Sequence, residues 1–440
     1  MHHSHEALDR SGGLTRSGLL TPLRERDFRL LWSAMCISLL GDGAFLVALA
    51  WQVYALSDAP TALSVVGIAM TVPTILFLLV GGVASDRLDR RSILIAADVG
   101  RGIAVGLMAA LAVGGWLELW HLVVLAAIYG TGSAFFAPAF DAFVPDLLHP
   151  ERLAQANALD QLVRPVALRL LGPALGGVVV GIAGASAVFA LDAASFAASC
   201  AVLLLIRAPA RRSVAEAGSV LADLRAGWRY VRERSWLWAT FASAAIAYLM
   251  FMGPVEVLLP YVVKHPLHGD ATDLGMVFAA GGLGSVICAV SIGRRGLPRR
   301  TMTVMYVVWT LATLAVAGYG LASAIWQLML ASLAFNALET AGTIIWATVK
   351  QRHVPGELLG RVSSLDWLIS IGLLPLSFAL TGPAAAAFGA QATLVGAGIL
   401  GAIVTAAALL VPGTRAVEEP RSRSAAQHAL PGVAQDLELV

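Results

Sequence analysis

Long apolar stretches alternate with short polar ones along almost the whole chain. A helix needs about 20 mostly apolar residues to cross the hydrocarbon core of a bilayer, and twelve stretches of this sequence have such a length. Because lipid offers backbone groups no hydrogen-bond partner, each stretch is predicted to form a transmembrane helix. The predicted spans are residues 30–53, 61–83, 92–114, 120–144, 156–182, 187–207, 236–262, 273–293, 302–321, 325–349, 361–387 and 390–411.

The composition agrees with an all-α membrane protein. Of 440 residues, 58% are hydrophobic and only 13% are charged, whereas about 25% are charged in an ordinary globular domain. The net charge is +2, and most of the arginines fall in loops beside predicted spans or in the tails. Nucleic-acid binding is therefore excluded, and most of the chain is expected to contact the lipid bilayer.

The basic residues indicate the orientation of the chain in the membrane. They gather in the loops that share a side with both termini, and loops rich in arginine stay in the cytoplasm. Both termini are therefore predicted to be cytoplasmic, in a multi-pass protein of the bacterial cytoplasmic membrane. The residues concerned are Arg24, Arg26, Arg29, Arg87, Arg90, Arg91, Arg207, Arg211, Arg212, Arg225, Arg229, Arg232, Arg234, Arg294, Arg295, Arg299, Arg300, Lys350, Arg352 and Arg361.

One long interior loop, residues 208–235, divides the chain into two sets of six spans, 30–207 and 236–411. Apolar residues recur in this loop at helical spacing with arginines between them. This pattern predicts an amphipathic helix lying along the inner face of the membrane, as a linker between the two halves. The two tails, residues 1–29 and 412–440, are expected to be cytoplasmic. The C-terminal tail is polar and contains proline, and it is expected to be disordered.

A short charged loop, from Gly82 to Arg91, joins the second and third predicted spans. Its sequence, Gly-Val-Ala-Ser-Asp-Arg-Leu-Asp-Arg-Arg, resembles the G-x-x-x-D-R-x-G-R-R loop of major facilitator superfamily transporters. Asp89 stands where that pattern has glycine. The resemblance implies a cytoplasmic gate whose charges hold or release a moving bundle. The expected gate residues are Gly82, Asp86, Arg87, Arg90 and Arg91, facing Asp141 and Arg361.

The fifth predicted span contains Gly172-Pro173-Ala-Leu-Gly176-Gly177. This segment resembles the second half of the antiporter signature of the superfamily, although Leu168 replaces the glycine expected upstream. Proline frees a carbonyl and glycine allows close backbone approach, so the helix is predicted to bend there during transport. Tight packing alone is the structural alternative.

Other segments are similar to the drug- and siderophore-exporting branch of this superfamily, including macrolide and enterobactin exporters. They start at Pro22, Phe136 and Val354, and the resemblance covers residues 22–411. It implies two six-helix bundles around a site at the bilayer midplane. The implied function is export of amphiphilic small molecules by alternating access, coupled to proton antiport, by a monomer without a metal or cofactor. Export of a siderophore or metabolite, and uptake, are the alternatives within this fold.

Four of the charged residues inside predicted spans are candidates for a functional role, because charge there is costly and often functional. Asp42, flanked by glycines, is predicted to bind the coupling proton, unless it is only hydrogen-bonded at a helix contact. Glu256 and Glu339 are candidates for proton binding or for attracting a cationic substrate. Arg169 has no partner nearby in the sequence, so it either lines the cavity or pairs with a carboxylate such as Asp42.

Other charged residues in the spans favour a structural interpretation. Asp98 and Arg101 are three residues apart, and Asp160 and Arg164 are four apart, so each pair can neutralise itself on one helix face. Asp192 falls near the outer end of the sixth predicted span and is expected to reach interfacial water.

A polytopic membrane enzyme, such as a prenyl- or acyltransferase, is the alternative from another class. It would need a carboxylate cluster or a His-Asp pair at the membrane face. The sequence has no DDxxD-type pair, and its histidines gather at the termini and in an outer loop. We therefore expect a transporter rather than an enzyme.

Overall fold

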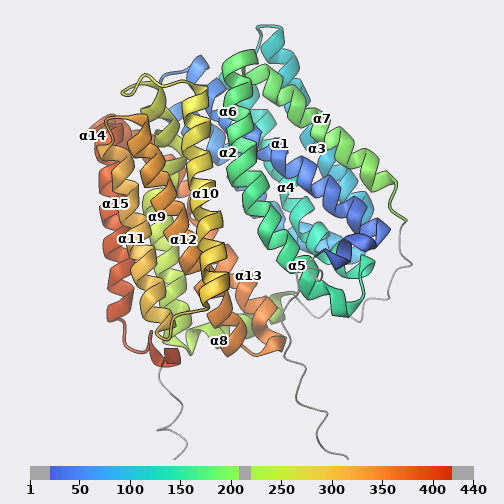
Figure 1. The fold of residues 1–440 in the computed structure, drawn as a ribbon, viewed down its shortest axis with the longest axis vertical. Coiled ribbons are helices and arrows are strands. Elements are labelled where there is room, and N and C mark those ends of the chain that lie inside the picture. Colours follow the sequence, from blue (N-terminus) through green and yellow to red (C-terminus); the bar gives the residue numbers. More distant parts are fainter. Residues whose placement is uncertain (1–19, 208–219, 419–440) are drawn as a thin grey trace, which may run out of the picture.

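The computed structural model describes residues 20–207 and 220–418, and this part of the chain is helical throughout (Figure 1). Twelve candidate membrane spans occur in it, which confirms the predicted all-α class. The first six spans contain α1 (Arg26–Leu56), α2 (Pro60–Arg87), α3 (Arg90–Val113), α4 (Leu119–Leu147), α5 (Pro150–Pro165) continued by α6 (Gly172–Ala183), and α7 (Ala185–Leu204). The other six contain α9 (Ser235–Lys264), α10 (Ala271–Arg295), α11 (Thr301–Leu321), α12 (Ile325–His353), α13 (Gly356–Gly372) continued by α14 (Leu374–Phe388), and α15 (Ala390–Ala407).

The helices form two bundles that follow the order of the chain (Figure 1). In the N-terminal bundle α2 packs on α4 and α3 packs on α7, and in the C-terminal bundle α10 packs on α12 and α11 on α15. The bundles meet where α6 lies against α10 and where α2 lies against α14. Toward the end that carries α8 (Val220–Arg232), the ribbons of the two bundles spread apart (Figure 1).

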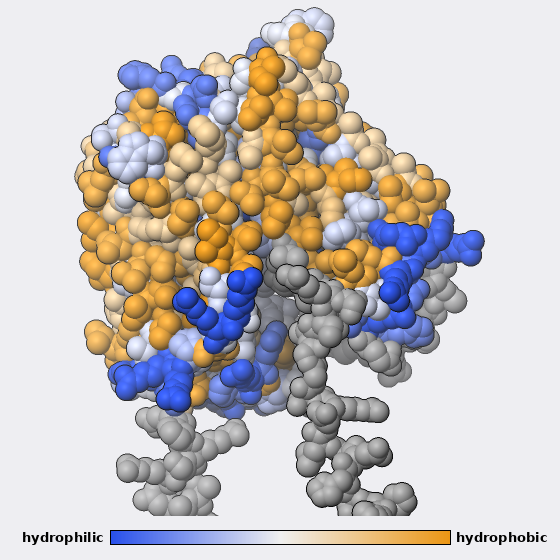
Figure 2. All heavy atoms as spheres, viewed as in Figure 1, coloured by the Kyte–Doolittle hydropathy of each residue, from blue (hydrophilic) through white to orange (hydrophobic). Residues whose placement is uncertain are grey.

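Large apolar side chains cover the outside of the bundles. Figure 2 shows hydrophobic residues over the middle of one face, with hydrophilic residues gathered toward its ends. Val113 and Ile182 have 78% and 82% of their surface exposed. In water such exposure would favour aggregation, whereas acyl chains solvate it, which agrees with the membrane assignment.

The bundles approach one another closely where glycines of α6 and α10 face each other. A Cβ atom added to Gly177 of α6 would lie 2.6 Å from the Ala271 carbonyl oxygen and 2.8 Å from the Gly275 Cα atom of α10. Neither contact leaves room for a side chain. Small residues of this kind allow backbone-to-backbone packing between membrane helices.

The fifth span is irregular just before Gly172 and Pro173. Its middle segment, Val166–Leu171, is π-helical, and the Gly172 N–H donates to the Ala167 carbonyl. Pro173 has no N–H to donate to the carbonyl of Arg169, and a Cβ atom on Gly282 of α10 would lie 2.4 Å from that oxygen. Such wide turns often mark functional sites, and this one lies at the contact between the bundles.

The linker and the C-terminal tail both contain ordered structure. The helix α8 packs against α13, where a Cβ atom on Gly227 would lie 3.1 Å from the Arg361 Cβ atom. The tail was expected to be disordered from residue 412, but its first part folds back. Glu418 accepts hydrogen bonds from the Thr303 N–H at 2.6 Å and Oγ1 at 2.9 Å, because the first turn of α11 leaves backbone donors unpaired. Residues 1–19, 208–219 and 419–440 lie outside the described part of the chain.

A buried ion pair joins α12 to α13. Lys350 donates to the Asp366 carboxylate, and the Trp346 Nε1–H donates to the same oxygen at 2.7 Å. The two side chains are 11% and 12% exposed. This pair lies inside the C-terminal bundle.

We expect Lys350→Met to lower the stability of the protein by about 3–5 kcal/mol, because it leaves a buried carboxylate without its cation. Thermal unfolding in detergent measures this change. The double variant Lys350→Met with Asp366→Asn removes both charges and is expected to recover most of the lost stability. An unchanged melting temperature for the single variant would contradict the prediction.

Candidate functional site

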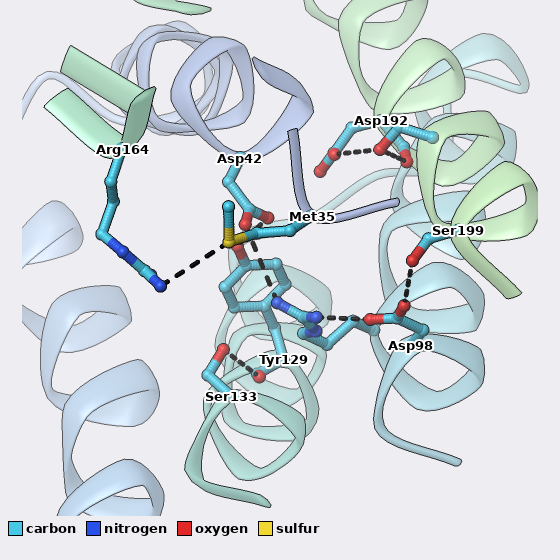
Figure 3. A network of polar contacts seen from close by, with 10 residues as sticks. Met35, Asp42, Asp98, Tyr129, Ser133, Arg164, Asp192 and Ser199 are labelled. Atoms are coloured by element: carbon cyan, nitrogen blue, oxygen red, sulfur yellow. Dashed lines mark hydrogen bonds and ion pairs between the residues drawn. The ribbon is translucent and has the colours of Figure 1, made fainter. Parts of the chain in front are cut away.

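A group of polar side chains lies inside the N-terminal bundle, at the junction of α1, α3, α4 and α7 (Figure 3). Asp42 of α1 accepts a hydrogen bond from the Tyr129 hydroxyl of α4 at 2.6 Å. Its second oxygen lies 3.7 Å from Nη1 of Arg101, on α3. Asp42 is therefore held from two directions by helices far from it in the sequence.

Arg101 is the cation of this group. It donates to Asp98 one turn earlier on α3, as its spacing predicted, and Asp98 also accepts a hydrogen bond from the Ser199 hydroxyl of α7 at 2.6 Å. The guanidinium lies over the rings of Phe136 and Phe196, 4.4 Å and 4.6 Å from their centroids. Aromatic faces stabilise a desolvated cation in this geometry.

The position of Arg101 depends on a glycine in α4. A Cβ atom on Gly132 would lie 2.7 Å from the Arg101 Cγ atom, so the arginine crosses α4 where that helix has no side chain. The superfamily often has a cavity arginine on its fourth span, which this sequence lacks. Here an arginine from the third span lies beside the fourth.

Asp192 of α7 completes the group and corrects an expectation. We expected this carboxylate to reach interfacial water, but the residue is 0% exposed because it faces α1. A Cβ atom on Gly41 would lie 2.2 Å from its Oδ1 atom. Ser195 donates to Oδ1 at 3.1 Å, and within the described residues Oδ2 has no hydrogen-bond partner.

The charges of this group do not balance. Asp42, Asp98, Asp192 and Arg101, together called the buried carboxylate cluster, hold three carboxylates and one guanidinium. If all were ionised the cluster would carry two uncompensated negative charges inside the membrane. Burying an ionised group without a partner costs several kcal/mol, so the cluster is suited to bind a proton.

A second set of charges lies where the two bundles face each other. Arg169, in the π-helical segment, is 3.9 Å from the Glu339 carboxylate of α12. The Arg169 side chain is 53% exposed although it lies in the middle of a span, and Glu256 of α9 is also exposed. These residues therefore border open space within the membrane layer. The carboxylate nearest to Arg169 among the described ion pairs is that of Glu339 and not that of Asp42.

The bundles also touch at the end opposite α8, in a group of residues that we call the closed end: Tyr54, Asp58, Val257 and Lys264. The Tyr54 hydroxyl donates to the Val257 carbonyl at 2.6 Å. Lys264 donates to the Tyr54 carbonyl and lies 3.5 Å from the Asp58 carboxylate. Burial lowers the pKa of the neighbouring His265 imidazole, so that ring is neutral at pH 7 and Lys264 supplies the charge opposite Asp58.

Tyr54→Phe is expected to loosen the closed end. One neutral hydrogen bond contributes about 1 kcal/mol, so the ratio of closed to separated molecules should fall about fivefold. Distances between spin labels in the α1–α2 and α9–α10 loops report this ratio. Tyr306→Phe is the matched control, because the Tyr306 hydroxyl pairs with Thr240 inside one bundle at 2.6 Å. Equal shifts in the two variants would refute the assignment.

The charged loop after α2 is held within the N-terminal bundle. Arg90 donates to the Ala142 carbonyl at 2.9 Å and to the Asp146 carboxylate at 2.5 Å. Arg91 donates to the last carbonyls of α7, those of Leu203 and Leu204. These hydrogen bonds of the two arginines therefore lie within the N-terminal bundle and do not reach the C-terminal bundle.

In this conformation the acids near the charged loop do not all contact it. Asp146, five residues after Asp141, pairs with Arg90, whereas Asp141 makes no ion pair within the described residues. The side chain of Asp86 lies outside the described part of the chain. Asp89, which replaces the glycine of the superfamily pattern, caps α3 by accepting from the Ser92 N–H at 2.9 Å.

The sequence is similar to those of known transporters over most of its length. A family model described as transmembrane secretion effector matches residues 17–439. The chain belongs to this family. Its relatives include the multidrug efflux pump Tap of Mycolicibacterium fortuitum, 25% identical over 86% of the chain and 94% of that protein. Macrolide efflux protein A of Streptococcus pyogenes is 20% identical over 80% of the chain and 88% of that protein.

The fold of this chain is also found among solved transporters. A bacterial homologue of the iron transporter ferroportin, in an inward-facing state, superposes with a TM-score of 0.63 at 17% identity, covering 86% of this chain and 98% of that one. The relatives and the fold are those of major facilitator transporters, not of enzymes. The predicted resemblance to this superfamily and to its exporters is therefore confirmed.

Proposed function

We propose that this transporter exports amphiphilic, drug-like small molecules across the bacterial cytoplasmic membrane by proton antiport. The direction and the class of substrate rest on the efflux pumps that it resembles over most of its length. The coupling rests on the buried carboxylate cluster, which is the observation that carries the proposal. Asp42 is the proton-binding residue, because it is the least buried carboxylate of the cluster, at 14% side-chain exposure.

The cluster links protonation to the packing of helices. Asp42 joins α1 to α3 and α4 through Arg101 and Tyr129, and Asp192 places α7 against α1. A proton on Asp42 weakens its attraction to Arg101 and changes the contact between α1 and α3. A ligand that alters such a contact in one conformation more than in the other shifts the conformational equilibrium. The proton thereby biases the bundle that contains it.

Glu256 and Glu339 are the substrate-facing acids in this proposal. Together with Arg169 they place two carboxylates and one guanidinium in the open space between the bundles. Their sum is one negative charge, which favours amphiphilic cations. The Arg169–Glu339 distance of 3.9 Å exceeds that of a good hydrogen bond, so a substrate cation can compete with Arg169 for Glu339.

Alternating access is the mechanism that the arrangement of the bundles supports. The structure is closed where Tyr54, Val257 and the Gly177–Gly275 contact join the halves. The α8 end is taken to face the cytoplasm, so this conformation corresponds to an inward-facing one. The π-helical turn before Gly172 and Pro173, with Gly176 packed on Ala44, is the segment that we assign to bending. The loop residues Gly82, Asp86, Arg87, Arg90, Arg91, Asp141 and Arg361 are the proposed gate of the opposite conformation.

Energised efflux tests the proposed function. Cells that express the protein should extrude ethidium, a lipophilic cation, and a protonophore should stop the extrusion. Cells with the empty vector supply the background. Extrusion that persists in the protonophore would contradict proton antiport. If a panel of drugs including ethidium is not extruded at all, the proposal fails for drug-like substrates, and siderophores, other metabolites and uptake become the functions to test.

A further inference from the structure

A cavity of about 420 Å³ opens at the α8 end of the C-terminal bundle, away from both charge sets described above. It lies between the α10–α11 loop, the start of α11, the end of α12 and the ordered part of the tail. Its size falls within the range of small-molecule sites. The residues that give it chemical character are Arg299, Thr301, Arg352, His353 and Glu418.

The cavity has more positive than negative charge available to a ligand. Glu418 is the acid among its lining residues, and its carboxylate is already bound by the Thr303 N–H and hydroxyl. Arg299 and Arg352 are exposed. Across residues 20–207 and 220–418, neither guanidinium has a hydrogen-bond or ion-pair partner. Two guanidinium groups without an ion-pair partner among the described residues thus border one concave space.

The cavity lies where two membrane spans end. Thr301 begins the α11 span and His353 ends the α12 span, so the cavity is at the depth of phospholipid phosphates. The first backbone N–H groups of α11 have no acceptor within the helix, and its dipole adds positive potential. Arginine is also the side chain best suited to bind phosphate oxygens in pairs.

We propose that this cavity binds a phosphate-bearing anion through Arg299 and Arg352. The same chemistry has two sources: the headgroup of an anionic phospholipid and a soluble phosphate. Basic pockets between membrane helices on the cytoplasmic side are known to take phospholipid headgroups. Binding there would join the α10–α11 loop to the end of α12, the helix that also carries Glu339.

The experiment uses the purified full-length protein, stripped of lipid in detergent. Retention of phosphatidylglycerol and of phosphatidylcholine is measured by native mass spectrometry, and binding of inorganic phosphate by thermal shift. The test variant is Arg299→Gln with Arg352→Gln. The control is Arg294→Gln with Arg295→Gln, which removes the same charge from the end of α10, outside the cavity. Both variants must show a cooperative melt.

A lipid source predicts preferential retention of phosphatidylglycerol that falls about tenfold or more in the test variant and stays near wild type in the control. A soluble source predicts stabilisation by inorganic phosphate that is lost in the same variant. The proposal is overturned if the two double variants lose binding equally, if neither loses it, or if neither probe binds the wild type.

A further variant tests the sign of the charge. Glu418→Gln retains an oxygen for Thr303 but removes the one acid of the cavity lining. Binding of the anion that the wild type retains should become about fivefold tighter. Weaker binding in this variant would contradict the electrostatic basis of the proposal.

Discussion

Asp42→Asn is expected to abolish the response of export to a pH gradient while substrate binding persists. Asparagine keeps the size of the side chain and an oxygen for the Tyr129 hydroxyl, which donates to Asp42 at 2.6 Å. It cannot bind and release a proton, and it no longer attracts Arg101. The effect of the gradient on substrate accumulation should fall about 5- to 150-fold, the usual range of coupling between two sites. Reconstituted vesicles with an imposed pH gradient measure this effect.

Asp160→Asn is the matched control for this prediction. Asp160 pairs with Arg164 on the same helix at 3.1 Å, as its spacing predicted, and lies outside the buried carboxylate cluster. The Asp160→Asn variant should therefore respond to the pH gradient as the wild type does. Substrate binding, measured by tryptophan quenching, separates lost coupling from a damaged cavity. An unchanged pH response in Asp42→Asn would reject Asp42 as the proton-binding residue.

Gly177→Leu is expected to stop transport by holding the bundles apart at the contact between α6 and α10. Even a Cβ atom there would lie 2.6 Å from the Ala271 carbonyl oxygen. Overpacking of a tight contact typically costs about 1–3 kcal/mol, which corresponds to about a 5- to 150-fold shift against closure. Efflux should fall to background, and spin labels in the α1–α2 and α9–α10 loops should report the longer distance.

Gly396→Leu separates this effect from a general cost of larger residues in the membrane. Gly396 lies in α15, and a Cβ atom there would meet nothing within 4 Å. Its efflux and label distances should match the wild type. Wild-type efflux in Gly177→Leu would show that the α6–α10 contact need not form during the cycle.

The twelve spans could be predicted from the sequence because lipid imposes a local rule. A segment of sufficient apolar length has to become a helix, whatever its neighbours are. Ion pairs within one helix could also be predicted, because the pairing of Asp98 with Arg101 and of Asp160 with Arg164 follows from helical spacing alone. The predicted start of the disordered tail was wrong, because polar contacts hold the first residues of the tail: Glu418 accepts a hydrogen bond from Thr303.

The buried carboxylate cluster could not be predicted, because it depends on which helices are neighbours. Asp42 and Arg101 meet only when α1 packs near α3 and α4, and the family pattern suggested an arginine on another span. Asp192 was misplaced because its depth was judged from distance to the span end. The signal available was indirect: Gly41 and Gly132 provide the gaps that Asp192 and Arg101 occupy, and their roles become evident only with the packing.

The location of the cluster has a consequence for how such a protein can evolve. All four of its members belong to the N-terminal bundle, whereas Glu256 and Glu339 belong to the C-terminal one. In the proposed mechanism, proton coupling and substrate selection thus belong largely to different bundles of one chain. Exchange of the C-terminal bundle between related pumps should transfer the range of exported drugs. The dependence of export on the pH gradient should remain that of the pump that supplies the N-terminal bundle. In that mechanism, mutations in the C-terminal bundle would change the exported drugs without altering the proton-binding residues of the N-terminal bundle.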